Sequence, residues 1–220
     1  IIIITTDGED IIAVVYDDLL VEVLFTADNK FKSSPSLLKA GDDYVVMAGS
    51  YDDSMHAVSL SGEVLFQIGV GENVNSSASF VNFNGIAYAF FGADDGFVYA
   101  TDMSGQFLDG WPKDLGGGVN IDTSVSFSDL DGDGSPEAII GASSKLYAFH
   151  MNGQLYDKFP ISYEFAFTGT PAIADLDGDN DLEILLGSSG SLVSIDVMDS
   201  GGVSDIYWSQ DRANNKRNGF

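Results

Sequence analysis

Two stretches of this sequence share a pattern of acidic residues that constrains the fold more than any other feature. Residues 129–141 read DLDGDGSPEAIIG, and residues 175–187, which lie 46 positions further on, read DLDGDNDLEILLG. In both stretches carboxylates occupy positions 1, 3, 5 and 9, and an apolar run then ends at a glycine. Because the two stretches align residue for residue, we expect each to belong to one structural unit that the chain repeats.

A longer pattern contains these stretches and occurs in four copies. Each copy begins with a short segment rich in serine, threonine and apolar residues, and its next apolar run ends at a glycine. The copies start 43, 47 and 46 positions apart, which is the repeat length of a four-stranded propeller blade. The sequence therefore predicts an all-β fold, a β-propeller of four-stranded antiparallel blades. The starting residues and their glycines are Ser34 and Gly49, Ser77 and Gly92, Ser124 and Gly141, and Thr170 and Gly187.

Two further strands are predicted in each copy, separated by a tight turn that contains glycine. The third strands are expected at Met55–Leu60, Phe97–Thr101, Leu146–His150 and Leu192–Val197. The fourth strands are expected at Val64–Ile68, Gln106–Leu108, Gln154–Tyr156 and Val203–Trp208. The start of the chain matches only the later part of the pattern, with strands expected at Ile1–Thr5, Ile11–Tyr16 and Leu20–Phe25.

We therefore expect residues 1–220 to form a single propeller domain or a propeller fragment with about five blades, of which the first is incomplete. An open ring leaves unpaired strand edges, so we expect either that upstream residues complete a larger ring or that the tail supplies the missing strand. A polar tail that lies on the acidic body remains the alternative. The expected blades are 1–33, 34–76, 77–123, 124–169 and 170–208, followed by a closing tail at 209–220.

The composition excludes several classes of function. The chain has 9 basic and 34 acidic residues and a net charge of −25, which argues against nucleic-acid binding and favours cations as ligands. It has no cysteine and no apolar run long enough for membrane insertion. It also lacks an initiator methionine, so we expect it to be a piece of a longer or processed protein.

The acidic stretches have the spacing expected of a calcium loop. Ca²⁺ takes six to eight oxygen ligands, and alternate residues of a tight loop can point at one centre. Without an ion, such clustered carboxylates would repel one another by about 1 kcal/mol per pair. We therefore predict about two bound Ca²⁺ ions, with position 7 contributing its carbonyl oxygen. The candidate metal ligands are Asp129, Asp131, Asp133, Ser135, Glu137, Asp175, Asp177, Asp179, Asp181 and Glu183.

Two other structures also place acidic residues close together in a loop. A helix–loop–helix calcium hand needs glutamate at position 12, where this chain has Ile140 and Leu186. The other interpretation is an acidic, solvated hairpin turn without metal. In two copies an ordinary turn takes the same place, and Asn84-Gly85 is a strong hairpin signal. The predicted ion therefore has a structural role at a corner of the blade.

These motifs resemble the FG-GAP (integrin α-type) calcium-binding β-propeller repeats of secreted bacterial proteins. The resemblance is carried by the two acidic stretches, by Phe91-Gly92-Ala93, and by Gly110-Trp111-Pro112 with its counterpart Lys158-Phe159-Pro160. The tail from Trp208 to Phe220 looks like the segment that closes many such propellers. The resemblance implies an extracellular or cell-surface module with calcium held in the two loops.

Two hypotheses of function follow. The first is a non-catalytic, calcium-stabilised adhesion or protein-interaction module of a larger secreted protein. Its partner, a protein or a carbohydrate, would bind inter-blade loops such as Gly69–Ser76 and Gly116–Asp122. The alternative is an accessory or catalytic propeller of a secreted hydrolase or lyase, with its site at the central channel. The sequence shows no nucleophile motif, and we interpret His56 and His150 as ordinary strand residues.

Overall fold

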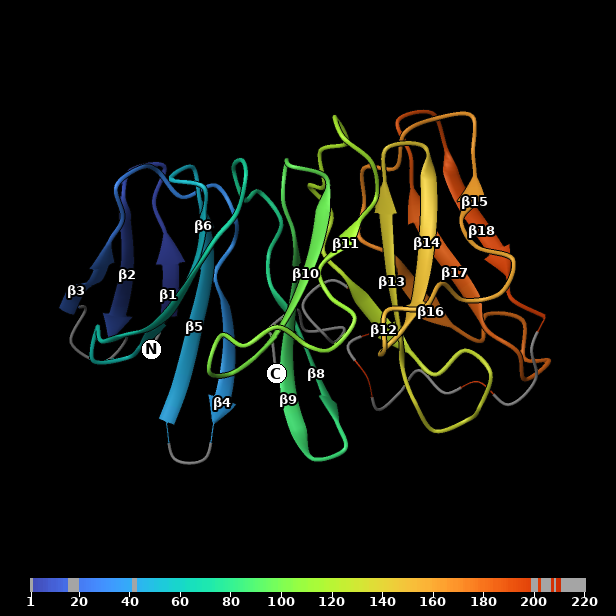
Figure 1. The fold of residues 1–220 in the computed structure, drawn as a ribbon, viewed down its shortest axis with the longest axis horizontal. Coiled ribbons are helices and arrows are strands. Elements are labelled where there is room, and N and C mark those ends of the chain that lie inside the picture. The colour runs from blue at the N-terminus through green and yellow to red at the C-terminus, as the bar shows by residue number, and fades with distance from the viewer. Residues whose placement is uncertain are drawn as a thin grey trace.

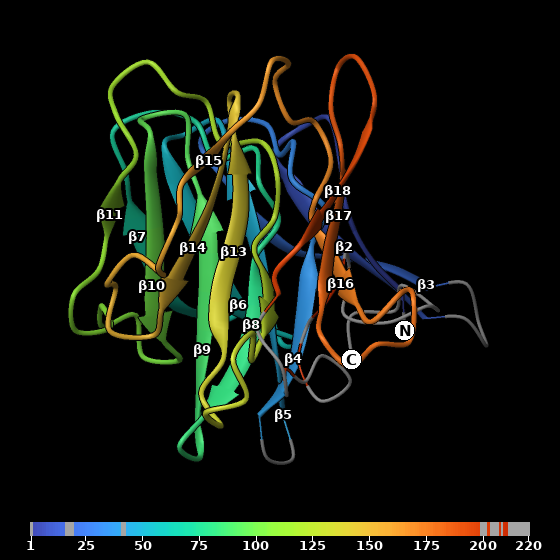
Figure 2. The ribbon, with the colours of Figure 1, turned by 90° about the vertical axis from the view of Figure 1, so that its right-hand side faces the viewer.

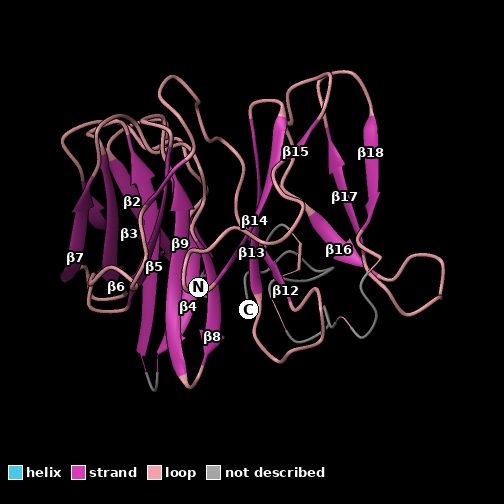
Figure 3. Cartoon of the chain, turned by 45° about the vertical axis from the view of Figure 1, so that its right-hand side comes forward, coloured by secondary structure: helices cyan, strands magenta, loops and turns pink. Residues whose placement is uncertain are grey.

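The computed structural model describes residues 2–15, 20–40, 43–198, 202, 207, 209 and 210. These residues form five antiparallel sheets joined by loops, and Figure 3 shows strands and loops throughout. No helix long and apolar enough to span a bilayer occurs in that part of the chain. The prediction of an all-β fold with five blades, the first of them incomplete, is confirmed.

Each sheet is a meander in which neighbouring strands follow one another along the chain. The first sheet comprises β1 (Ile2–Thr5), β2 (Asp10–Val15) and β3 (Leu20–Thr26). The second comprises β4 (Ser36–Ala40), β5 (Asp43–Ser50), β6 (Ser54–Ser59) and β7 (Val64–Gly69). The third comprises β8 (Ser79–Phe83), β9 (Ile86–Gly92), β10 (Phe97–Asp102) and β11 (Lys113–Asp114). The fourth comprises β12 (Ser126–Ser128), β13 (Glu137–Ala142), β14 (Lys145–His150) and β15 (Ile161–Ser162), and the fifth β16 (Ala172–Ala174), β17 (Glu183–Gly187) and β18 (Leu192–Asp196).

From left to right the sheets follow one another in chain order, and the fifth sheet overlaps the fourth at the right-hand side (Figure 1). The view turned by 90° shows that strands of successive sheets run in similar directions, with loops gathered above and below them (Figure 2). An inner sheet is covered on both faces, so its second strand reads as a continuous apolar run rather than an alternating one. In β5, Val46 and Ala48 pack in the cluster shared with the first sheet, whereas Val45 and Met47 pack in the cluster shared with the third.

The glycine at the end of the second strand is explained by close packing between sheets. A Cβ atom on Gly92 would lie 2.2 Å from Cγ2 of Ile121, and one on Gly49 would lie 2.4 Å from Cγ1 of Val74. Phe167 takes the same place beside Gly141, at 3.0 Å. These three side chains, which we call the entry residues, are Val74, Ile121 and Phe167, and each belongs to the loop that leads into the next sheet.

A hydroxyl group two residues after the entry residue then binds the glycine of its own sheet. Ser76 Oγ accepts a hydrogen bond from Gly92 N at 2.7 Å and donates one to Gly92 O at 2.8 Å. Thr123 donates in the same way to Gly141 O, at 2.6 Å. The loops into the third and fourth sheets therefore contact the preceding sheet with an apolar side chain and their own sheet with a polar one.

The outer strands of the third and fourth sheets differ from the prediction. Instead of strands at Gln106–Leu108 and Gln154–Tyr156, the structure has single bridges at Phe107 and Leu155, and the paired strands β11 and β15 come later. The backbone turns away between bridge and strand, where φ is +84° at Gly110 and +66° at Lys158. The tight turn was predicted correctly, but the position of the strand beyond it was wrong.

The last predicted strand, Val203–Trp208, and the closing tail lie almost entirely outside the described residues. The residues described there do show where the chain goes. Ile173 N of β16 donates a hydrogen bond to Ser209 O at 2.8 Å. The chain after the fifth sheet therefore returns to the first strand of that sheet.

Candidate metal centre

The acidic loop of the fourth sheet connects β12 to β13 and is wrapped around Asp129. Gly132 N donates to Asp129 Oδ1 at 2.8 Å, Asp133 N to the same oxygen at 3.1 Å, and Gly134 N to Oδ2 at 2.8 Å. The values of φ are +74° at Gly132 and +89° at Gly134, so both positions favour glycine. Asp129 is only 3% exposed. The first carboxylate of the motif therefore organises the backbone of the loop as well as facing its centre.

Glu137 closes the loop from its other end. As the first residue of β13 its side chain is fully buried, and its Oε2 accepts a hydrogen bond from Leu130 N at 2.8 Å. Its Oε1 lies 2.9 Å from Nδ1 of His150 on the neighbouring strand. This bond from Leu130 N ties the start of the loop to its end.

The loop of the fifth sheet, between β16 and β17, repeats this arrangement. Gly178 N donates to Asp175 Oδ1 at 2.6 Å and Asn180 N to Oδ2 at 3.3 Å. Leu176 N donates to Glu183 Oε2 at 2.6 Å. Asn180, which stands where the other loop has a glycine, has φ of +75°. The two loops therefore share backbone hydrogen bonds from positions 2, 4 and 6 and a positive φ at positions 4 and 6, with asparagine in the left-handed region it tolerates.

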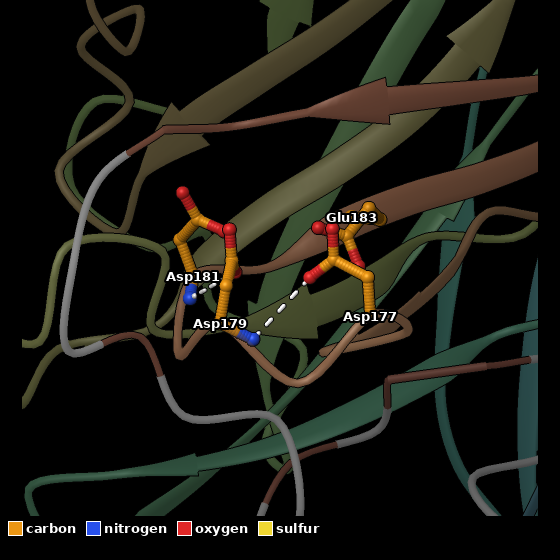
Figure 4. Close-up of side chains that lie close together, drawn as sticks. All are labelled: Asp177, Asp179, Asp181 and Glu183. Atoms are coloured by element: carbon orange, nitrogen blue, oxygen red, sulfur yellow. Dashed lines mark hydrogen bonds between the residues drawn. The ribbon is translucent and has the colours of Figure 1, made fainter.

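Seven of the ten predicted ligands are brought together. In each loop one oxygen per carboxylate lies within 4.8 Å of all the others in its group. Figure 4 shows the second group, with dashed lines for the bonds from Asp179 N to Asp177 and from Asp181 N to Asp179. Asp133 and Asp175 stand outside these groups of side chains, and Asp181 joins through its carboxylate. The contribution of the carbonyl oxygens of Ser135 and Asp181 stays a prediction. The two groups are Asp129, Asp131 and Glu137, and Asp177, Asp179, Asp181 and Glu183.

Both groups contain a carboxyl that holds its proton unusually firmly. Burial raises the pKa of Glu137 to about 8, and the charges of Asp131 and Asp129 also raise it, against the bond from Leu130 N. A hydrogen bond with Asp179 is the main reason why the pKa of Asp181 rises to about 6, with burial as the next cause. Each loop therefore concentrates negative charge that a bound cation would neutralise.

The chain beyond the fifth sheet covers the loop of the fourth sheet. A Cβ atom on Gly202 would come within 3.0 Å of Asp129 O. Burial raises the pKa of Tyr207, and the charges of Asp129 and Glu137 raise it further. The loop of the fifth sheet is more open, because Leu176 is 57% exposed whereas the corresponding Leu130 is fully buried.

Sequence reasoning missed the residues that face the two terminal glutamates. In the strand pairing Glu137 stands opposite His150, and Glu183 stands opposite Asp196. The signal that could have found them is the turn that follows the second strand. Counting outward from the pair Ala142 and Lys145 at this turn leads to Glu137 and His150.

The other corners and the other histidine have simpler arrangements. The turn between β8 and β9 is the predicted Asn84-Gly85 hairpin, with φ of +52° and +77°. His56 is buried on β6, and its Nε2 lies 2.8 Å from Asp52 Oδ2. Within the described ranges, the two acidic loops contain the groups of three or more converging metal-ligating side chains.

The sequence was compared with models of known protein families, and part of it matches. The model of the FG-GAP-like repeat matches residues 129–186, which begin at the first residue of one acidic loop and include the whole of the other. The resemblance inferred from the motifs is therefore confirmed for this segment, which matches an FG-GAP-like repeat. No curated protein matches the chain by sequence.

Solved structures that resemble the chain show its fold. BamB from Moraxella catarrhalis is 14% identical, with a TM-score of 0.59 over 92% of this chain and 62% of that one. BBS1N, solved in complex with ARL6DN, is 11% identical, with a TM-score of 0.62 over 88% of this chain and 56% of that one. A protein of unknown function from Bacteroides caccae is 13% identical, with a TM-score of 0.53 over 88% of this chain and 68% of that one. The chain is a β-propeller in fold, and it spans less than two thirds of the first two structures.

Proposed function

We propose that this chain is a non-catalytic β-propeller module, stabilised by about two calcium ions, that binds a partner outside the cell. The observation that carries the proposal is the duplicated loop. Two corners of the protein share one pattern of backbone bonds and direct carboxylate oxygens at a common centre. In the third sheet a plain hairpin builds the same corner, which supports a structural role for the ion.

The donor set fits a hard divalent cation. All the converging atoms are carboxylate oxygens, which are the ligands Ca²⁺ prefers, and carbonyl groups and water would complete its coordination. The ions would be held by the two groups of carboxylates defined above. A bound ion would offset their mutual repulsion and fix the ends of β13 and β17 relative to the preceding strands.

The loops between sheets are the proposed binding surface for a partner protein or carbohydrate. Residues of loops 69–76 and 116–122, together with the turn between β9 and β10, line a depression of about 520 Å³. Burial raises the pKa of Asp94 in this depression, and the charges of Asp122 and Glu72 also raise it. A partner that docks here would therefore present hydrogen-bond donors. The depression is lined by Glu72, Asn73, Asp94, Asp95, Gly118 and Asn120.

The proposed location is the cell surface or the extracellular space, as part of a larger secreted protein. Calcium loops of extracellular modules bind at about 10⁻⁴–10⁻³ M, a concentration met outside cells and not in the cytosol. The net charge of −25 is compatible with a soluble module in a salt-containing medium.

Calorimetric titration of the metal-free protein with calcium tests the proposal. We expect binding of about two ions, and chelation with EDTA should lower the melting temperature by several degrees. The double variant Asp131→Asn/Asp177→Asn should bind no calcium and melt at one temperature with or without EDTA. A wild-type protein that gives no heat of binding and no shift on chelation would refute the calcium proposal.

A further inference from the structure

The two acidic loops differ in a position that the repeat pattern does not include. Each loop ends at a glutamate that begins the second strand, and the residue opposite this glutamate lies on the third strand. It is His150 in the fourth sheet and Asp196 in the fifth. The corresponding pair in the third sheet, which has no acidic loop, is Tyr88 with Asp102. The two candidate cation sites therefore differ in the residue that is paired with their terminal glutamate.

In the fourth sheet both oxygens of the terminal glutamate are already engaged. Glu137 Oε2 accepts from Leu130 N at 2.8 Å, and Oε1 lies 2.9 Å from His150 Nδ1. Glu137 is fully buried, so solvent does not compete for these contacts. A cation bound in this loop would share Glu137 with the imidazole, and it would have three converging carboxylates in all.

In the fifth sheet the opposite residue adds negative charge. Four carboxylates converge in this loop, and Asp196 faces the last of them, Glu183. Asp196 stands outside the converging group, and its Oδ1 accepts a hydrogen bond from Met198 N at 3.0 Å. Its field nevertheless reaches Asp181, across the loop. A cation bound here would contact four carboxylates and would also be attracted by the negative charge of Asp196.

We propose that the residue opposite the terminal glutamate sets the relative cation affinity of the two loops, so that the fifth-sheet loop binds calcium more tightly than the fourth-sheet loop. The inference rests on the proposed calcium binding. His150 acts as a positioning residue, because it holds Glu137 Oε1 against β14. Asp196 acts through its charge. By Coulomb's law, one unit charge about 6 Å from a divalent ion changes the affinity for that ion about tenfold in a largely solvated site.

The test measures each loop separately. Asp177→Asn leaves the fourth-sheet loop as the single site, and Asp131→Asn leaves the fifth-sheet loop. Into the first background we introduce His150→Asp, and into the second Asp196→His. Affinities for calcium come from calorimetry, and terbium luminescence lifetimes count the water molecules on the bound ion. Both readouts report on the site rather than on folding stability as long as the variant is folded under the conditions of the titration.

We expect His150→Asp to tighten the fourth-sheet site about tenfold and Asp196→His to weaken the fifth-sheet site about tenfold. Val21→Glu on the exposed strand β3 of the first sheet adds a negative charge at the opposite end of the molecule from both loops (Figure 1) and should change either affinity less than twofold. His150→Gln, which keeps a donor near Glu137, should leave the fourth-sheet site within about threefold of its starting affinity. If His150→Asp does not fold, Asp196→His and Asp196→Asn carry the test.

Equal affinities in the two single-site proteins, or reciprocal variants that change neither affinity, would overturn the inference while leaving calcium binding intact. Single-site proteins that bind no calcium at all would overturn the proposed function as well. Tighter binding at the fourth-sheet loop in the starting proteins would reverse the assignment of the stronger site and overturn the inference too.

Discussion

The fourth and fifth sheets carry the same acidic loop in different surroundings. In the fourth sheet Asp129 is 3% exposed and Leu130 is fully buried, whereas in the fifth sheet Asp175 is exposed and Leu176 is 57% exposed. Two backbone bonds to the first carboxylate, from positions 4 and 6, are nevertheless found in both loops. The comparison shows that the residues of the loop determine its conformation. Its contribution to the free energy of unfolding depends on the residues that cover it.

Removing the first carboxylate of each loop should give the largest difference between the two sheets in the free energy of unfolding. Asp129→Ala removes the charged acceptor of three part-buried hydrogen bonds, and we expect a loss of about 4 kcal/mol in the free energy of unfolding. Asp175→Ala removes two bonds in an exposed loop and should cost about 1 kcal/mol. Urea unfolding of both metal-free variants measures this difference, and equal losses would contradict the role assigned to burial.

The pH dependence of the metal-free protein tests the buried carboxyl of the fourth sheet. Burial raises the pKa of Glu137 from 4.5 to about 8, so between these values the folded protein keeps a proton that the unfolded chain has released. The unfolded state then binds fewer protons, and stability must fall as the pH rises through this window, by on the order of 3 kcal/mol. Thermal melts of wild type and Glu137→Gln from pH 5 to pH 8 measure the effect.

Glu137→Gln should flatten this pH dependence, because glutamine can still accept from Leu130 N and does not ionise. Calcium at millimolar concentration should cancel the same dependence in the wild type, because the bound ion favours the ionised form. A wild-type protein with the same metal-free stability at pH 5 and pH 8, in the presence of EDTA, would contradict this account of Glu137.

A smaller contrast is expected at the glycines that end the two second strands. A Cβ atom at Gly141 would lie 3.0 Å from Cβ of Phe167, so Gly141→Ala should cost about 1–2 kcal/mol through displacement of this entry residue. At Gly187 no described atom comes within 4 Å of the added carbon, and Gly187→Ala should change stability by less than about 0.5 kcal/mol. Chemical denaturation would show the order of the two effects, and a larger loss at Gly187 would invert it.

The course of the acidic loops was predictable from the sequence because its causes are local. Gly132, Gly134 and Asn180 permit a left-handed backbone, and the carboxylate of position 1 lies within reach of the N–H groups that follow it. The five sheets were predictable for a related reason, since the repeat of glycine and apolar runs marks each unit. Both features can be recognised within a dozen residues of the chain.

The features that escaped prediction depend on partners far along the chain. His150 faces Glu137 across 13 residues of sequence, and the pairing of the two strands decides which side chains meet. The burial of Asp129 depends on Gly202 and Tyr207, which follow the next sheet. The outer strands were misplaced because turns at Gly110 and Lys158 redirect the chain before it pairs.

The entry residues also define where one repeat can be exchanged for another. Ile121 packs on Gly92 of the sheet before it, while Thr123, two residues later, bonds to Gly141 of its own sheet. A repeat unit that is cut out at Ser124, where the first strand region begins, would lose Ile121, the side chain that packs this sheet against the preceding one. A cassette that begins at Ile121 and ends before Phe167 would include the entry residue that packs on the preceding sheet. The sheet that receives it would then need only a glycine at the position of Gly92. Recombination of such chains should therefore succeed at boundaries three residues ahead of those suggested by the strands.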